Sequence, residues 1–301
     1  AQQARQVHWS RSFTVQCGCS HNSGSNSGSS SSNGQLPITA LVFNFPQNKS
    51  ADMRDTHLLS LNELTTLFHE WGHALHSLLS STTYQHLSGT RGAMDFVEVP
   101  SHLFEGFAND ARCLKKWARH YETGGSPPLG LLENAIRSKA EFESIDVSNQ
   151  ILYSMIDQHI FGKQFGDVTS LSDDEVYQKV IDASLYLQQQ HTLLPFASGV
   201  SGEAMRSQLG VDVTAATASG SNSGAYPAMY LPSHTHFVTY GGGYYAYMYA
   251  KMAASHIWAE NFAEDPFSRT AGMKLWDSML RHGVSKPPKE MLQDLCGGGD
   301  V

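Results

Sequence analysis

The chain has 301 residues, which suffices for one large domain or two small ones. With 41% hydrophobic and 16% charged residues, its composition is typical of a folded globular protein. The net charge of −8 argues against a nucleic-acid-binding protein. No apolar run reaches the length that crosses a bilayer, so we expect neither nucleic acid nor a membrane as a partner.

Two strands are expected near the start of the chain. Residues 10–19 contain a β-prone run, and residues 36–45 are rich in β-branched and aromatic side chains. Residues 21–34 between them are nearly all Ser, Asn and Gly, which indicates a flexible hairpin loop. A second flexible loop of similar composition is expected at residues 217–224.

A helix is expected to begin near residue 60, with Ser60 or Asn62 as its cap. Apolar residues recur along it at helical spacing: Leu64, Phe68, Trp71, Leu75 and Leu78. The three histidines at positions 69, 73 and 76 fall on roughly the opposite face. The pattern predicts a helix that packs through its apolar stripe and presents the histidines elsewhere.

Residues 69–73 of this helix have the pattern His-Glu-x-x-His. Histidines four positions apart lie on one side of a helix, so His69 and His73 can bind one zinc ion. Glu70 is placed to take a proton from the water that the ion activates. An ordinary amphipathic helix with surface histidines is the alternative, but the apolar counter-face favours a metallopeptidase site.

A catalytic zinc ion normally has three protein ligands. Candidates for the third are Asp95, Glu98, Glu105 and Asp110, whereas His76 lies on the same helix and would close the site less well. Glu98 and Glu105 are two helical turns apart, so one could bind the metal while the other orients an imidazole. The spacing does not choose between them, and both could also be solvated charges.

The rest of the chain is expected to be largely helical. Helices are predicted from about residue 100 to 121 and over residues 131–162, 172–190, 244–262 and 265–283, with a break at 286–288. Ser172 is expected to cap the helix at 172–190, with Glu175 in the capping-box position. Residues 84–94 are expected to form a connecting loop. The sequence therefore predicts a mainly α fold with a small β-sheet beside the metal-binding helix.

Residues 236–247 form a second unusual segment, rich in tyrosine and glycine. Tyr240, Tyr244 and Tyr247 recur at about one helical turn, and His236 precedes them. Phenol and imidazole donors can stabilise the negative charge that develops on a carbonyl oxygen during peptide hydrolysis. A glycine turn followed by an aromatic core helix explains the same pattern, so the sequence leaves both interpretations open.

Several of these motifs together resemble the thimet oligopeptidase family of zinc metallopeptidases. The resemblance is carried by residues 68–76, 87–91 and 95–110, and it extends to the segments at 236–247 and 265–272. Within the family, the intermediate peptidases of mitochondria, in a fungal-like form, are the most similar. The resemblance spans about residues 13–296.

This resemblance implies roles for individual residues. It assigns one zinc ion per chain to His69, His73 and Glu98, the glutamate that precedes Val-Pro-Ser, with Glu70 as the general base. His236, Tyr240 and Tyr247 would contact the oxyanion, and Tyr244 would contact substrate. Thr239 stands where the family has glycine, which puts the local hinge in doubt.

The resemblance also implies a zincin-like helical catalytic domain over residues 1–301, a fragment that lacks the family's N-terminal helical half. The expected activity is that of a monomeric zinc metalloendopeptidase in the mitochondrial matrix, removing an N-terminal octapeptide from imported precursor proteins. The alternatives are a general oligopeptidase that degrades short peptides, a non-catalytic peptide-binding relative, and a fragment that is inactive alone.

Overall fold

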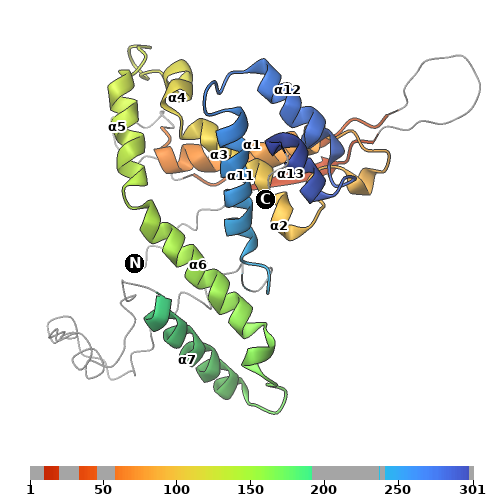
Figure 1. The fold of residues 1–301 in the computed structure, drawn as a ribbon. Coiled ribbons are helices and arrows are strands. Elements are labelled where there is room, and N and C mark those ends of the chain that lie inside the picture. Colours follow the sequence, from red (N-terminus) through yellow and green to blue (C-terminus); the bar gives the residue numbers. More distant parts are fainter. Residues whose placement is uncertain (1–9, 20–33, 46–57, 192–236, 238–240, 298–301) are drawn as a thin grey trace, which may run out of the picture. The chain divides into compact units, whose positions relative to one another are not determined.

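A computed structural model describes residues 10–19, 34–45, 58–191, 237 and 241–297 (Figure 1). The chain divides into two compact units. The first comprises Ala1–Glu143 and Ala246–Val301, and the second comprises Ser144–Tyr245. The loop predicted at 217–224 lies outside the described residues, and so does the loop at 21–34 except for Gly34.

The two expected strands pair as an antiparallel sheet in the first unit. Strand β1 (Ser10–Gln16) pairs with β2 (Ile38–Phe43), with Phe13 opposite Ala40 and an irregularity between Thr14 and Gln16. The predicted strands are confirmed. β-Branched and aromatic residues favour this extended, paired backbone.

Strand β1 turns polar side chains inward, and several apolar side chains of the sheet are exposed on its outer face. On the inner face, Ser10 and Thr14 form hydrogen bonds with residues of helix α1 (Leu61–Leu79). On the outer face, Phe13, Val15 and Ile38 are 42%, 66% and 51% exposed. Hydroxyl groups rather than apolar packing therefore link β1 to the helix.

Helix α1 begins where the sequence predicted. The Ser60 hydroxyl accepts a hydrogen bond from the Glu63 backbone N–H, and the Glu63 carboxylate accepts one from the Ser60 N–H. This reciprocal pair satisfies two backbone donors that the first turn of a helix leaves open. Ser60, and not Asn62, is the cap.

The predicted packing of α1 is wrong. Trp71 and Leu78 of the proposed apolar stripe are 47% and 39% exposed, whereas Gly72 and His76 are buried. The reason is that α1 lies between two neighbours, the sheet and helix α3 (Val99–Ala108). Contacts from two sides select small and polar residues that hydropathy periodicity does not detect.

The helix expected from about residue 100 to 121 is two helices instead, and a short helix precedes them. Glu98 ends that short helix, α2 (Met94–Val97), and begins α3, which ends at Ala108. The Asp110 carboxylate then accepts backbone hydrogen bonds that begin α4 (Ala111–Trp117). The capping side chain at Asp110 starts a new helix, because its carboxylate satisfies the first free N–H groups.

The main hydrophobic core lies in the first unit. It combines α2 and α3 with α11 (Ala246–Asn261), α12 (Arg269–Ser278), the 3-10 turn η5 (Leu280–His282) and α13 (Pro288–Cys296). Its buried members include Phe96, Val99, Leu103, Ala250, Ile257, Leu275, Met279, Met291 and Leu295. Helix α3 thus has the core on one side and α1 on the other.

Helix α13 was not predicted, because the proline pair at 287–288 was interpreted only as a break. Proline is tolerated in the first turn of a helix, and α13 begins at Pro288. Its residues Met291, Leu292 and Leu295 are buried in the main core.

The helix predicted over residues 131–162 is interrupted. It consists of α5 (Leu129–Ala140) in the first unit and α6 (Glu143–Ile160), nearly all of which belongs to the second. In the second unit, α6 is followed by the 3-10 turn η3 (Lys163–Phe165) and α7 (Asp173–His191). The predicted capping pair of Ser172 and Glu175 at the start of α7 is confirmed.

The fold is mainly α with one small sheet against α1, as predicted. A short 3-10 turn, η2 (Gln85–Leu87), lies in the segment expected to be a loop. All four cysteines are free. Within the described residues, no helix is both long enough and apolar enough to span a membrane.

Candidate metal centre

Helices α1 and α3 approach closely at Gly72. A Cβ atom on Gly72 would lie 2.6 Å from the Pro100 carbonyl oxygen and 2.6 Å from the Ser101 Cα. No side chain fits at such distances, so only glycine permits this contact. The contact places the histidines of α1 beside the first turn of α3.

Three side chains from these helices converge on one point. The Nε2 atoms of His69 and His73 lie 3.3 and 3.1 Å from the Glu98 Oε2 atom. The three donor atoms lie within 4.8 Å of one another and could hold a metal ion. Ligands at zinc's usual bond lengths and tetrahedral angles are separated by roughly 3.3 Å, so the observed distances fit zinc.

Glu98 is held in place by Ser101. The Ser101 hydroxyl lies 2.8 Å from the Glu98 backbone oxygen and 2.9 Å from Oε2, the oxygen that faces the histidines. Ser101 is fully buried, so this contact is shielded from water. The sequence analysis did not single out Ser101, although a serine three residues after a helix-capping position is a known hydrogen-bonding pattern.

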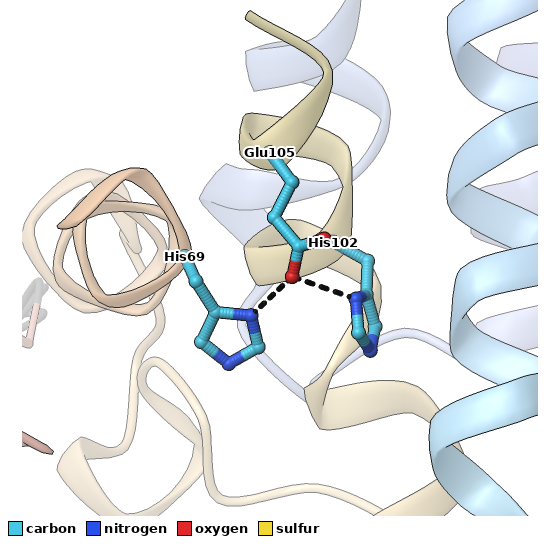
Figure 2. A group of neighbouring side chains, drawn as sticks. All are labelled: His69, His102 and Glu105. Carbon is cyan, nitrogen blue, oxygen red and sulfur yellow. Dashed lines mark hydrogen bonds and ion pairs between the residues drawn. The ribbon is translucent and has the colours of Figure 1, made fainter. Parts of the chain in front are cut away.

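Glu105 contacts the other nitrogen of His69. The His69 Nδ1 atom lies 2.7 Å from Glu105 Oε1, and the His102 Nδ1 atom lies 2.9 Å from the same oxygen (Figure 2). An ionised carboxylate only accepts hydrogen bonds, so both Nδ1 atoms must carry protons. In neutral His69, the Nε2 lone pair is then free to bind a metal.

The carboxylates dominate the electrostatics of this group. Burial lowers the pKa of His69, but hydrogen bonds and charges from Glu105 and Glu98 outweigh it and raise this pKa to about 10. Burial raises the pKa of Glu98 and Glu105, but the histidines outweigh it, holding Glu98 well below its usual range and Glu105 at about 2. The metal-free site therefore favours two carboxylates and a protonated His69.

Glu70 follows His69 on α1 and is mostly buried, with 8% of its surface exposed. Its Oε1 atom accepts a hydrogen bond of 3.0 Å from the Ser10 hydroxyl on β1. The small sheet thus contributes directly to the position of this carboxylate. No local pattern points to Ser10, because the contact joins residues that are 60 positions apart in the chain.

The other acidic and histidine candidates have different surroundings. Asp110 pairs with Arg112 and caps α4. His76 is fully buried, and burial, partly offset by the backbone of Gly283, lowers its pKa to about 4. Among the described residues, Asp110, His76 and Asp95 belong to no group that could hold a metal.

The tyrosine segment is only partly described. His236 and Tyr240 lie outside the described residues. Tyr244 belongs to the second unit, where it is buried and its hydroxyl donates a hydrogen bond of 3.0 Å to Gln150. Tyr247 lies in the first turn of α11 in the first unit and is partly buried.

A buried carboxylate fixes the backbone just before Tyr244. Asp157 on α6 accepts hydrogen bonds of 2.9 Å from the backbone N–H groups of Gly242 and Tyr244. Phe237 stacks on the Tyr244 ring, with centroids 5.1 Å apart. Hydrogen bonds to Asp157 therefore hold the end of the glycine turn against α6.

Comparison with known proteins agrees with this geometry. The chain is 37% identical over 265 residues to the mitochondrial intermediate peptidase of Arabidopsis thaliana, covering 87% of this chain and 32% of that protein. It is 32% identical over 261 residues to the human mitochondrial intermediate peptidase, covering 87% of this chain and 31% of the relative. The chain thus spans about a third of the length of these curated relatives.

The Neurospora crassa mitochondrial intermediate peptidase is 34% identical over 281 residues, covering 88% of this chain and 30% of the relative. The sequence profile of peptidase family M3 matches residues 8–298, nearly the whole chain. The chain belongs to peptidase family M3.

Proposed function

We propose that this chain carries the active site of a zinc metalloendopeptidase that processes mitochondrial precursor proteins. The observation that carries the proposal is the convergence of His69, His73 and Glu98 on one point, with distances that suit zinc. Membership of peptidase family M3 supports the same chemistry. One zinc ion per chain would polarise the scissile carbonyl and acidify a water molecule.

Glu70 is the proposed general base. Its carboxylate takes the proton of the attacking water and later delivers it to the leaving amine. The Ser10 hydroxyl limits the rotation of this carboxylate by binding Oε1, and the other oxygen, Oε2, is left to accept the proton. Glu98 is the proposed third ligand, and Glu105 orients His69 through its Nδ1 atom.

Tyr247, Tyr240 and His236 are the proposed donors to the oxyanion, and Tyr244 is the proposed substrate contact. The Tyr244 hydroxyl donates a hydrogen bond to Gln150 on α6, so it would have to leave Gln150 in order to donate to the substrate. Substrate binding would then remove a contact with α6.

The proposed substrate is an imported precursor protein, from which an N-terminal octapeptide is removed in the mitochondrial matrix by a monomeric enzyme. The support for this specificity and location is the similarity to the mitochondrial intermediate peptidases of plants, animals and fungi. A general oligopeptidase with the same zinc chemistry is the second candidate. It would cut short peptides at many positions.

The decisive experiment measures zinc content and peptide cleavage together, with and without a chelator. We expect about one zinc ion per chain and cleavage that stops when the chelator removes it. Precursor peptides that release one octapeptide support the processing enzyme, and scattered cuts support the general oligopeptidase.

The variant Glu70→Gln tests the base. We expect turnover to fall by about 10²–10⁴-fold while zinc remains bound, because only the proton acceptor is lost. Glu133→Gln, at an exposed position on α5, is the matched control and should cleave normally. Unchanged turnover in Glu70→Gln would refute this mechanism.

A further inference from the structure

We infer that His102 is a positioning residue for the metal ligand His69 and acts through Glu105. The inference rests on the proposed zinc site and adds a residue that does not bind the metal. His102 and Glu105 lie one turn apart on α3, and both side chains point toward His69 on α1 (Figure 2).

A single oxygen atom joins the two histidines. Glu105 Oε1 accepts a hydrogen bond from His69 Nδ1 at 2.7 Å and another from His102 Nδ1 at 2.9 Å. The bond to His69 fixes the tautomer in which Nε2 is free for the metal. His69 is therefore only as well oriented as the Glu105 carboxylate.

Glu105 needs a second contact to hold that orientation. A glutamate side chain has several rotatable bonds, so one contact alone leaves much of its conformational freedom. The Glu105 side chain is 22% exposed, so water competes for its oxygens. The hydrogen bond from His102 holds the accepting oxygen at the position where His69 can donate to it.

His102 is itself well placed for this role. Its backbone N–H donates a hydrogen bond of 3.1 Å to the Glu98 carbonyl, so it lies one turn after the proposed third ligand. Its side chain is only 13% exposed. The His102 ring also packs edge-on against the His69 ring, with centroids 5.2 Å apart and an angle of 79° between planes.

Glu98, His102 and Glu105 consequently share one face of α3, at spacings of four and three residues. His69 and His73 share the facing side of α1. Glu98 and Glu105 reach His69 from opposite sides of its ring, because they contact Nε2 and Nδ1 respectively. Loss of the His102 contact would free Glu105 and let His69 exchange tautomers.

The test compares two amide variants of His102. Asparagine can place an N–H donor where Nδ1 of histidine lies, whereas glutamine places it near the position of Nε2. We expect His102→Asn to bind zinc nearly as tightly as the original chain. We expect His102→Gln to bind zinc about tenfold more weakly, the lower end of the effect of losing an outer-shell partner.

Zinc affinity is measured by competition with a chromophoric chelator, and the ligand geometry by the visible spectrum of the cobalt-substituted chain. The spectrum of His102→Gln should change, and that of His102→Asn should not. Thermal unfolding of the metal-free variants separates this effect from a loss of folding. His86→Asn and His86→Gln, at an exposed histidine, are matched controls that should leave both readouts unchanged.

A double-mutant cycle tests whether His102 acts through Glu105. Glu105→Gln should weaken zinc binding by about 10–100-fold, and adding His102→Gln should weaken it little further. Equal zinc affinity and spectra for His102→Asn, His102→Gln and the original chain would overturn the inference, as would fully additive losses. An original chain that binds no zinc would instead overturn the proposed function, and the inference with it.

Discussion

The metal centre and the tyrosine segment are built in different ways. The proposed ligands and positioning residues of the metal centre lie on α1, on α3 and at Glu98, which precedes α3; the two helices belong to one unit and meet at Gly72. The residues of the tyrosine segment belong to both units, with Tyr244 in the second and Tyr247 in the first. The proposed metal binding depends on a helix–helix contact within one unit, and the proposed oxyanion donors do not take part in that contact, so the two functions should be separable.

Loss of the Tyr247 hydroxyl should separate the oxyanion function from metal binding most clearly. Tyr247→Phe is expected to lower turnover by about 10²–10³-fold, the usual effect of losing an oxyanion donor, with no change in zinc affinity. The measurement is steady-state cleavage of a peptide together with chelator competition for zinc. Tyr245→Phe, at a position that is 43% exposed, is the control and should cleave normally. Weaker zinc binding in Tyr247→Phe would show that the two regions are not independent.

A change of pH should act on the metal centre through His69. The pKa of His69 is raised from 6.5 to about 10 in the metal-free chain, so zinc must displace a proton at neutral pH. We expect the apparent zinc affinity to rise about tenfold per pH unit between pH 7 and 9 from this proton. Calorimetry in buffers with different ionisation enthalpies measures the proton released.

The same shift has a defined effect on stability. Because the folded pKa of His69 lies above its unfolded value, its protonation stabilises the metal-free fold fully below pH 6.5. That contribution is lost as the pH rises through about 10. In Glu105→Gln, the proton release on zinc binding at pH 8 should be smaller; an equal release would contradict the assignment to His69.

A single methyl group at Gly72 should disturb the metal centre through its scaffold. In Gly72→Ala the new Cβ would meet the backbone of α3, and such overpacking lowers the free energy of unfolding by about 1–3 kcal/mol. Zinc affinity should fall as well, because α1 and α3 carry the ligands. Denaturant unfolding and chelator competition measure the two effects.

The matched control for that variant is Gly272→Ala on α12. Apart from its chain neighbours and the backbone of α12 itself, no atom of the described residues lies within 4 Å of the position that its Cβ would take. Alanine is a better helix former, so this variant should be more stable by about 0.5–1 kcal/mol. If Gly72→Ala behaved in the same way, the close contact between α1 and α3 would not be needed.

The smallest effect is expected at the start of α1. Ser60→Ala removes the capping hydroxyl and should lower the free energy of unfolding by about 1 kcal/mol. Zinc affinity should stay unchanged, because the first turn of α1 carries no ligand. Ser60→Asn, which can still cap the helix, should restore the stability, and failure to do so would indicate a different role for this hydroxyl.

Local chemistry explains what the sequence could predict. The capping pairs at Ser60 and Ser172, the two strands and the mainly α character all follow from residues close together in the chain. The His-Glu-x-x-His spacing likewise brings His69 and His73 to one side of a helix without any knowledge of the fold.

Tertiary contacts explain what the sequence could not predict. Spacing left Glu98 and Glu105 as equal candidates, because the choice depends on which nitrogen of His69 each carboxylate faces. The apolar stripe of α1 was misleading because α3 and the sheet cover the helix from two sides. Ser10 reaches Glu70 across a separation of 60 residues, beyond any local pattern.

The short distance along the chain between Glu98 and the two histidines affects how the protein assembles. Closing a loop between residues 73 and 98 has a small entropic penalty, which grows only by about 0.6 kcal/mol with each doubling of loop length. A zinc ion at this centre would cross-link the two ends of that short loop. This would favour early association of α1 with the start of α3 during folding. The hairpin and the distant C-terminal helices would then add to a nucleus that already contains the ligands.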